Sequence, residues 1–154
     1  AARRRVGEIL RFLGLSPLAD EPAGSLPYGL QRRTELARAL ATEPRLLLLD
    51  EPAAGLNPQE TAELGQILLR IRERGITILL VEHHMDLVMA ISDHVIVLDY
   101  GETIAEGTPA QIRENTQVQE AYLGQPGAIH AIEAAAQGRK NRVRIRSGEG
   151  LAWH

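Results

Sequence analysis

The sequence contains no cysteine, which excludes a disulfide framework or a thiolate metal site and suits a reducing compartment. Aromatic residues make up only 3% of the chain, so aliphatic side chains and alanine must fill its core. No apolar run approaches the roughly 20 residues of a membrane-spanning helix, and no apolar signal core follows the basic residues 3–5. We therefore expect a soluble protein, or one peripheral to a membrane.

Charge is unevenly distributed along the 154 residues, a length that suits one domain with a sizeable core. Residues 1–123 carry a net charge of −6, whereas residues 124–154 carry +3. We interpret the first part as the folded domain and the second as a basic, flexible tail. Alternating basic and apolar residues at 139–146 also occur in nucleic-acid or anionic-lipid patches. We favour a solvated terminus, or a segment foreign to the domain, over such a patch.

Strands that alternate with helices predict an α/β fold, a parallel sheet with a small antiparallel hairpin. Apolar runs predict strands over 45–50, 76–81 and 95–98, and residues 102–107 are expected to pair with the third strand. Helices are predicted over about 3–13, 30–42, 58–74, 84–91 and 116–123. A further helix is expected to open with Thr108 as N-cap and Pro109 in its first position.

Helical spacing also predicts which side chains are buried. The expected buried positions of the first three helices are Val6, Ile9, Leu10 and Leu13, then Leu36, Ala37, Leu40 and Ala41, then Leu64, Ile67, Leu68 and Ile71. In the turn over 52–58, Gly55 and Asn57 suit unusual backbone angles.

Residues 45–52, Arg-Leu-Leu-Leu-Leu-Asp-Glu-Pro, form the stretch around which the chain is organised. A continuous apolar run predicts a strand buried on both faces, as in parallel sheets. Asp50 and Glu51 follow it, at the strand end where open α/β sheets bind ligands. The alternative is a buried strand that ends in a solvated turn. The second buried strand, 76–81, is followed by Glu82 and His83.

Carboxylates and an imidazole at two strand ends are the groups that a phosphate-transfer site requires. One acid holds Mg²⁺ through water, a second orients and deprotonates the attacking water, and a polar group senses the terminal phosphate. Neighbouring acids in unequal environments divide such roles. Glu82 is read here as a residue that shapes its strand end, and His84 and His94 as surface or packing residues.

Four motifs in this order resemble the second half of an ABC-transporter ATPase. They are Tyr-Gly-Leu-Gln-Arg-Arg at 28–33 with Leu-Ala-Arg-Ala-Leu at 36–40, then 46–52, then Ala-Gly-Leu-Asn-Pro at 54–58, then Val-Glu-His at 81–83. The signature, the turn at 54–58 and the ending over 98–109 are most similar to branched-chain amino-acid transport subunits. The resemblance covers residues 3–123 and implies a partial P-loop NTPase domain. Its helical and signature segment would be 1–43, and its Walker B part 44–123.

The resemblance implies a role for each matching residue. Asp50 would be the Walker B acid on the Mg²⁺ shell through water, Glu51 the general base, and His83 the switch histidine that contacts the γ-phosphate. The D-loop would be 54–57, with Gly55, Leu56 and Asn57 at the nucleotide. The signature residues that reach ATP in trans would be Tyr28, Gly29 and Gln31.

The resemblance also implies ATP and Mg²⁺ as cofactors and hydrolysis coupled to import of branched-chain amino acids. The expected partners are a second ATPase subunit in a head-to-tail dimer and transmembrane permease subunits. This places the protein in the cytoplasm, peripheral on the inner face of the plasma membrane. No nucleic-acid partner is expected.

The chain departs from the family pattern at the phosphate loop and the signature. The sequence G-x-x-x-x-G-K-[ST] is absent, and the only lysine is Lys140. Where the family has Leu-Ser-x-Gly-Gln, residues 26–30 read Leu-Pro-Tyr-Gly-Leu. Pro27 offers neither a hydroxyl nor an N–H, and Leu30 cannot hydrogen-bond. Each charge-assisted bond lost is worth about 1.5–3 kcal/mol, so binding in trans is expected to suffer.

Three interpretations follow from these matches and departures. The first is a C-terminal part of an importer ATPase, inactive alone because the Walker A half is absent. The second is a non-catalytic remnant that acts as an interaction module, and the third, based only on the basic tail, is half of a DNA-associated ATPase. In the related fold the P-loop strand lies between the strands at 76–82 and 94–99. Without it, these strands either pair directly or each keep an open edge, and we expect the hairpin 94–106 to be the least protected.

Overall fold

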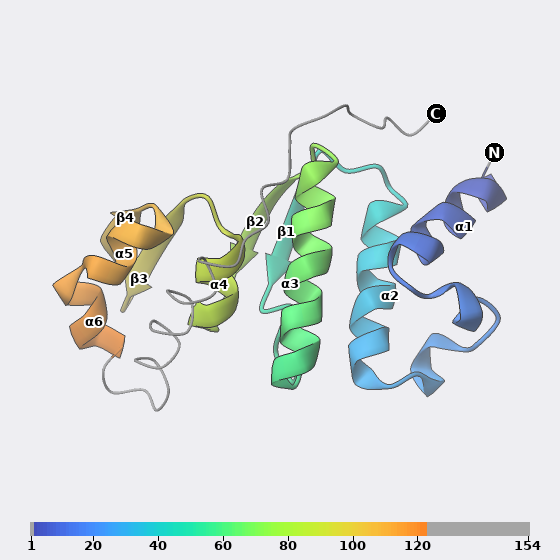
Figure 1. The fold of residues 1–154 in the computed structure, drawn as a ribbon, viewed down its shortest axis with the longest axis horizontal. Coiled ribbons are helices and arrows are strands. Elements are labelled where there is room, and N and C mark those ends of the chain that lie inside the picture. The colour runs from blue at the N-terminus through green and yellow to red at the C-terminus, as the bar shows by residue number, and fades with distance from the viewer. Residues whose placement is uncertain (1, 123–154) are drawn as a thin grey trace. The chain divides into compact units, whose positions relative to one another are not determined.

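The structure is a computed structural model, and it describes residues 2–122 (Figure 1). The chain divides into two compact units, one that ends at Val81 and one that begins at Glu82. The predicted basic tail and its alternating segment at 139–146 lie outside the described residues.

The first unit holds the two 3₁₀ turns and five of the longer elements. In chain order these are α1 (Ala2–Phe12), η1 (Ser16–Leu18), η2 (Ala23–Ser25), α2 (Tyr28–Leu40), β1 (Leu46–Asp50), α3 (Pro58–Glu73) and β2 (Thr77–Val81). β1 and β2 pair in parallel from Leu46↔Thr77 to Asp50↔Val81, and α3 is the crossover between them. The predicted parallel arrangement of these strands is confirmed.

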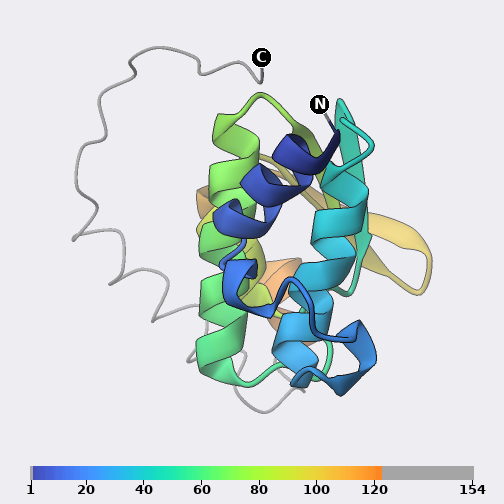
Figure 2. The same cartoon turned by 90° about the vertical axis from the view of Figure 1, so that its right-hand side faces the viewer.

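Helix α3 lies on one side of the β1–β2 pair in both views (Figures 1 and 2). The four aliphatic side chains predicted for its buried face, Leu64, Ile67, Leu68 and Ile71, are all buried. Leu47 of β1 is also buried, with 5% of its surface exposed. The core of this unit therefore forms between the helices and a single face of the strands.

The prediction that both faces of the strands are buried is wrong. Leu46 and Leu48 are 51% and 64% exposed, and Leu79 and Val81 of β2 are 58% and 57% exposed. Successive side chains of a strand point to opposite faces, and within residues 2–81 helices cover one face only. An unbroken leucine run reveals no such alternation, so the exposed face could not be seen in the sequence.

Three further expectations for this unit need correction. Helix α2 begins at Tyr28 and not at residue 30, because the Pro27 carbonyl accepts the amide N–H groups of Leu30 and Gln31 at 2.9 and 3.0 Å. Ala41, expected in the buried stripe, is exposed because it lies beyond the helix as its C-cap. Val6 is 49% exposed, whereas Ile9 one turn later is buried.

The second unit comprises α4 (Met85–Ile91), β3 (Val95–Asp99), β4 (Glu102–Gly107), α5 (Pro109–Glu114) and α6 (Thr116–Tyr122). β3 and β4 pair in antiparallel fashion, which confirms the predicted hairpin. Its two-residue turn, Tyr100 and Gly101, has φ angles of +46° and +84°, the conformation that fits the twist of paired strands. Thr108 caps α5 with Pro109 following it, as predicted.

The core of the second unit is made of side chains from the hairpin and all three helices. The buried members are Met89, Val95, Val97, Ala105, Ile112 and Val118. Ile96 and Leu98, on the other face of β3, are 57% and 60% exposed. The described strands form two separate two-stranded sheets, β1–β2 and β3–β4. Of the two alternatives given above, direct pairing of β2 with β3 or an open edge on each strand, the structure has the second. None of the helices between residues 2 and 122 is long and apolar enough to cross a membrane.

Candidate functional site

The turn that follows β1 holds the two predicted site carboxylates. Asp50 and Glu51 are both exposed at the carboxyl end of the parallel pair. The Glu51 N–H continues the ladder by donating to the Val81 carbonyl at 2.8 Å. The φ angle of Glu51 is +44°, a left-handed conformation that costs roughly 1–2 kcal/mol for a residue with a Cβ. Strain of this kind is concentrated at functional sites, because the surrounding fold holds the residue in place.

The same turn leads directly into α3. Ala54 N–H donates to the Glu51 carbonyl at 3.0 Å, and Ala53 between them is completely buried. Asn57 is the N-cap: its side chain accepts the Glu60 N–H at 2.9 Å, and the Glu60 carboxylate accepts the Asn57 N–H at 3.0 Å. Asn57 has an ordinary φ of −75°, so the expectation of an unusual angle there is wrong. Gly55, at φ +77°, meets that expectation.

The predicted signature residues Tyr28 and Gly29 pack against this turn. A Cβ placed on Gly55 would lie 3.0 Å from Tyr28 Cε1, and one on Gly29 would lie 2.6 Å from Glu60 Oε1. A pocket of about 330 Å³ opens beside these contacts, lined among others by Pro27, Leu30, Leu56 and Asn57. The structure thus brings the signature segment and the predicted D-loop of one chain together.

Gln31 and Arg32 fix the first turn of α2. Gln31 Nε2 donates to the Leu26 carbonyl at 2.8 Å, so this predicted nucleotide-binding side chain is turned back onto its own loop. Arg32 donates to the Tyr28 hydroxyl and to Glu35, the latter at 2.7 Å. The bond to Glu35 raises the pKa of the Arg32 guanidinium, although partial burial opposes the shift.

Two side-chain contacts were not predicted from the sequence, one between Tyr28 and Arg32 and one between Arg33 and Glu63. Tyr28 and Arg32 are four positions apart, and this helical spacing could have indicated their contact. The ion pair of Arg33 with Glu63 joins α2 to α3. Nothing in the sequence indicated it, because thirty residues separate the partners.

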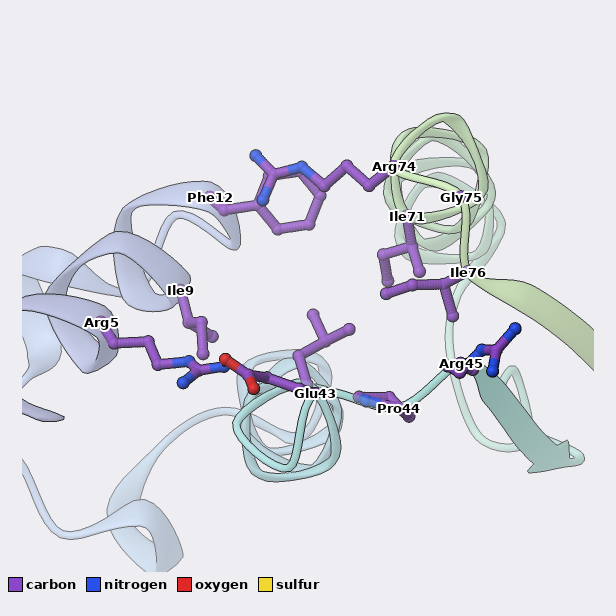
Figure 3. A pocket seen from close by; sticks show the side chains of 11 residues that line it. Arg5, Ile9, Phe12, Glu43, Pro44, Arg45, Ile71, Arg74, Gly75 and Ile76 are labelled. Atoms are coloured by element: carbon purple, nitrogen blue, oxygen red, sulfur yellow. The ribbon is translucent and has the colours of Figure 1, made fainter. Parts of the chain in front are cut away.

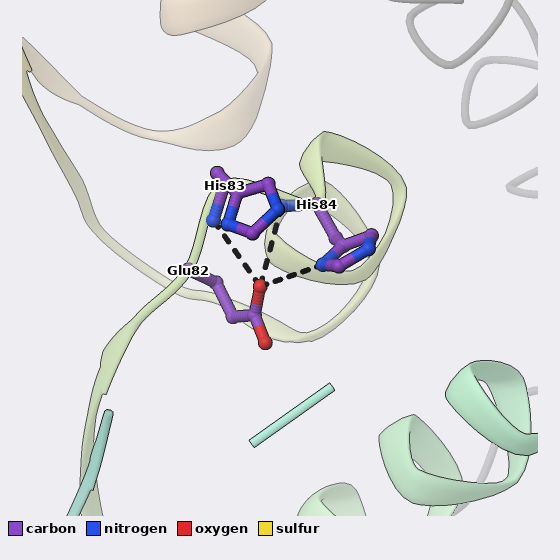
Figure 4. A group of neighbouring side chains, drawn as sticks. All are labelled: Glu82, His83 and His84. Carbon is purple, nitrogen blue, oxygen red and sulfur yellow. Dashed lines mark hydrogen bonds and ion pairs between the residues drawn. The ribbon is translucent and has the colours of Figure 1, made fainter. Parts of the chain in front are cut away.

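At the start of the second unit, Glu82 organises the turn that carries His83 (Figure 4). The Glu82 side chain is completely buried, and its Oε2 accepts the N–H groups of His83 at 3.1 Å and His84 at 3.3 Å. His84 Nδ1 lies 2.9 Å from the same oxygen. Glu82 therefore shapes its strand end, and His84 is a partly exposed residue bonded to it. His94 lies elsewhere in this unit, exposed and paired with Glu106 at 2.9 Å.

A second pocket, of about 340 Å³, lies at the other end of the first unit's strands (Figure 3). Arg45 and Ile76, which precede β1 and β2, line it, so it opens at the amino ends of the strands, away from Asp50 and Glu51. Arg74 extends over the Phe12 ring at 3.8 Å from its centroid. Burial lowers the pKa of Arg74, and the neighbouring charge of Arg70 adds to this effect. No residue predicted for nucleotide chemistry lines this pocket.

Comparisons with known proteins identify the family. A family profile described as ABC transporter matches residues 1–54, which include the signature segment and the turn after β1. A profile described as branched-chain amino acid ATP-binding cassette transporter matches residues 102–128. The branched-chain amino acid transport ATP-binding protein BraF of Pseudomonas aeruginosa is 52% identical over 117 residues, which are 75% of this chain and 46% of BraF. The chain belongs to the ABC transporter ATPase family.

Other relatives of this ABC ATPase agree. LivG of Escherichia coli is 50% identical over 122 residues, 79% of the chain and 48% of LivG. The solved ADP conformation of an ATP-binding cassette has a TM-score of 0.74 at 35% identity, covering 80% of the chain and 50% of that protein. A nucleotide-free cassette has a TM-score of 0.72 at 34% identity, covering 80% and 51%. The chain spans about half the length of the relatives it matches, and the predicted partial ABC ATPase fold is confirmed.

Proposed function

We propose that the chain is the signature-to-C-terminal part of an ATP-hydrolysing subunit that drives import of branched-chain amino acids. The family profile over 102–128 and the names of BraF and LivG support this substrate class. The observation that carries the chemistry is the turn after β1, where Asp50 and Glu51 are presented to solvent at the carboxyl end of a parallel strand pair, Glu51 in a left-handed conformation.

Asp50 suits the Mg²⁺ side of such a site. Its carboxylate is exposed, and Mg²⁺ prefers oxygen ligands while keeping several of its waters. Bound Mg²⁺ supplies charge neutralisation of the phosphates. Asp50 would hold its hydration shell, because the strand pairing Asp50↔Val81 fixes the backbone from which the carboxylate projects.

Glu51 suits the role of general base. It is exposed, adjacent to Asp50, and its backbone is held from both sides by the bonds to Val81 and Ala54. Such a carboxylate accepts a proton from water that attacks the terminal phosphate. His83 is proposed to contact the terminal phosphate of bound ATP, and the Glu82 carboxylate accepts its backbone N–H at 3.1 Å.

The remaining proposed contacts come from the signature segment and the D-loop. Tyr28, Gly29 and Gln31 would face ATP held by a second, head-to-tail subunit. Gly55, Leu56 and Asn57 would form the D-loop side of the same interface. The close packing of Tyr28 on Gly55 supports their movement as one body, since displacing either residue disturbs the other.

The proposed partners are a second ATPase subunit and transmembrane permease subunits, with the protein peripheral on the inner face of the plasma membrane. The support for permease partners is the family itself and the transport function in the names of its relatives.

A non-catalytic interaction module is the second candidate, and the geometry of the signature favours it. Pro27 is the N-cap of α2 and makes no side-chain cap hydrogen bond. The Leu30 side chain lines the pocket beside it, where a glutamine would offer polar groups. Both features weaken recognition of phosphate in trans.

A chimera distinguishes the two candidates. The part of the Pseudomonas aeruginosa relative that precedes its match to this chain would be fused ahead of the chain and expressed in a strain that lacks its own ATPase subunit. The proposal expects Mg²⁺-dependent ATP hydrolysis and restored uptake of branched-chain amino acids. If the chain is a non-catalytic interaction module, the chimera should associate with the permease but not hydrolyse ATP, even after Pro27→Ser and Leu30→Gln restore the family's signature.

A further inference from the structure

Glu82, His83 and His84 place three metal-ligating groups in one turn (Figure 4). Each offers one ligand atom, and these atoms all lie within 4.8 Å of one another. The rings of His83 and His84 have centroids 4.5 Å apart and are tilted by 32°. The three donors come from consecutive residues, so no long-range movement is needed to assemble them.

We propose that this turn is a binding site for a divalent transition-metal ion, with Zn²⁺ as the best-fitting member. Two imidazoles and one carboxylate form a donor set that Zn²⁺ binds with an open fourth position. Imidazole nitrogen is a suitable ligand for Zn²⁺, Cu²⁺ and Ni²⁺, whereas Mg²⁺ prefers oxygen ligands. The site is therefore distinct in chemistry from the Mg²⁺ position proposed at Asp50.

The distances fit this ion after small side-chain rotations. Bonds of about 2.0–2.2 Å to zinc place tetrahedral ligands roughly 3.3 Å apart. His84 Nδ1 and Glu82 Oε2 lie 2.9 Å apart in a hydrogen bond, and a bound ion would replace its proton as the two atoms separate to that spacing. The donor atoms of the three residues all lie within 4.8 Å of one another, so shifts of up to about 1.5 Å would bring them to that spacing.

Burial of the carboxylate prepares the turn for a cation. The Glu82 side chain is completely buried, and the N–H groups of His83 and His84 hold its Oε2 in place. The same oxygen lies 2.9 Å from His84 Nδ1, so the carboxylate and this ring are already held next to each other. The ion would thus meet a preorganised pair of ligands, to which His83 adds the third.

The test is a titration of the 154-residue chain with Zn²⁺ alone, by calorimetry at neutral pH, followed by Co²⁺ absorption to read the ligand field. The parent is expected to bind one Zn²⁺ in the micromolar range. His84→Ala removes one ligand and should weaken binding about tenfold or more. His94→Ala is the matched control, because His94 belongs to the same unit but is paired with Glu106 outside this turn, and it should leave the affinity unchanged.

Glu82→Gln provides a second variant, which keeps the shape of the side chain but removes its charge, and it should also weaken binding about tenfold. A parent that binds Zn²⁺ no better than millimolar would overturn the proposal. So would His84→Ala and Glu82→Gln proteins that bind as the parent does, or a His94→Ala protein weakened as much as His84→Ala. None of these readouts depends on ATP hydrolysis, so the result is independent of the proposed function.

Discussion

The ring of Tyr28 lies so close to Gly55 that a Cβ on the glycine would sit 3.0 Å from Tyr28 Cε1. The two residues are twenty-seven positions apart, one at the start of α2 and the other in the turn that leads to α3. Their contact joins the segment that resembles the ABC signature to the segment that resembles the D-loop, within one chain. The Arg32 guanidinium also lies over the Tyr28 ring, 4.9 Å from its centroid.

Gly55→Ala should destabilise the fold by more than backbone strain alone. Gly55 has φ +77°, where a Cβ costs roughly 1–2 kcal/mol, and the Tyr28 contact adds to this. Gly75→Ala is the matched control, since Gly75 has φ +81° with nothing within 4 Å of the added Cβ. Urea unfolding is expected to give a larger loss for Gly55→Ala than for Gly75→Ala. Equal losses would mean that the Tyr28 contact carries no energy.

Glu82→Ala should lower the free energy of unfolding by about 1–3 kcal/mol, because it leaves the N–H groups of His83 and His84 without their acceptor. Glu82→Gln keeps an acceptor oxygen and should cost less. The control is Glu106→Ala, whose exposed pair with His94 should contribute under about 1 kcal/mol. Chemical denaturation of the three variants checks this. A Glu82→Ala protein as stable as Glu106→Ala would remove Glu82 from its role in the turn.

Sequence reasoning found most of what is local. The capping of α5 by Thr108, the pairing of β3 with β4 and the buried stripe of α3 each depend on residues a few positions apart, so spacing was enough. It also placed Asp50 and Glu51 together at a strand end, because a strand's carboxyl end is defined by where its apolar run stops.

What it missed depends on partners distant in the chain or absent from the described residues. Leu48 and Leu79 are exposed because α3 covers the other face of their strands. A strand in which nearly every residue is apolar does not show which of its faces will be covered. Glu51 has a φ of +44° and its backbone bonds to Val81, thirty residues away, so its residue type alone did not indicate this conformation. The packing of Tyr28 on Gly55 needed the crossing of two elements that spacing cannot specify.

The chain by itself is expected neither to bind ATP tightly nor to hydrolyse it. Its sequence contains no P-loop motif, and hence no lysine and amide cradle for the β- and γ-phosphates. Calorimetric titration with Mg-ATP is the measurement. Micromolar affinity would contradict the expectation and would show that another part of the chain holds the phosphates.

In the chimera that also carries Pro27→Ser and Leu30→Gln, Glu51→Gln should abolish turnover but preserve ATP-driven dimerisation. The amide cannot take a proton from water, yet it keeps the shape and leaves Asp50 intact. ATP hydrolysis and size-exclusion chromatography with ATP separate the two effects. Glu106→Gln serves as control, because Glu106 is exposed on β4, pairs with His94 and has none of the proposed roles. Turnover of Glu51→Gln within a few-fold of its parent would exclude Glu51 as the base.

The hairpin of β3 and β4 is expected to be the least protected sheet element and a site of self-association. Its strand β3 pairs only with β4, which leaves one edge of the backbone without a strand partner among the described residues. Ile96 and Leu98 add an exposed apolar face beside that edge. Exposed edges of this kind pair with other chains.

Hydrogen exchange and substitution test this last expectation together. Amides of residues 95–98 should exchange faster than those of residues 46–49, which the α3 crossover ties into its unit. Ile96→Lys should reduce light scattering at high concentration while the protein stays folded, because the charge falls on the exposed face. Val97→Lys should instead unfold the unit, since Val97 is only 5% exposed. If 95–98 are protected as strongly as 46–49 in a dilute monomer, and Ile96→Lys leaves the scattering unchanged, the edge is closed in solution and the hairpin is as stable as the parallel pair.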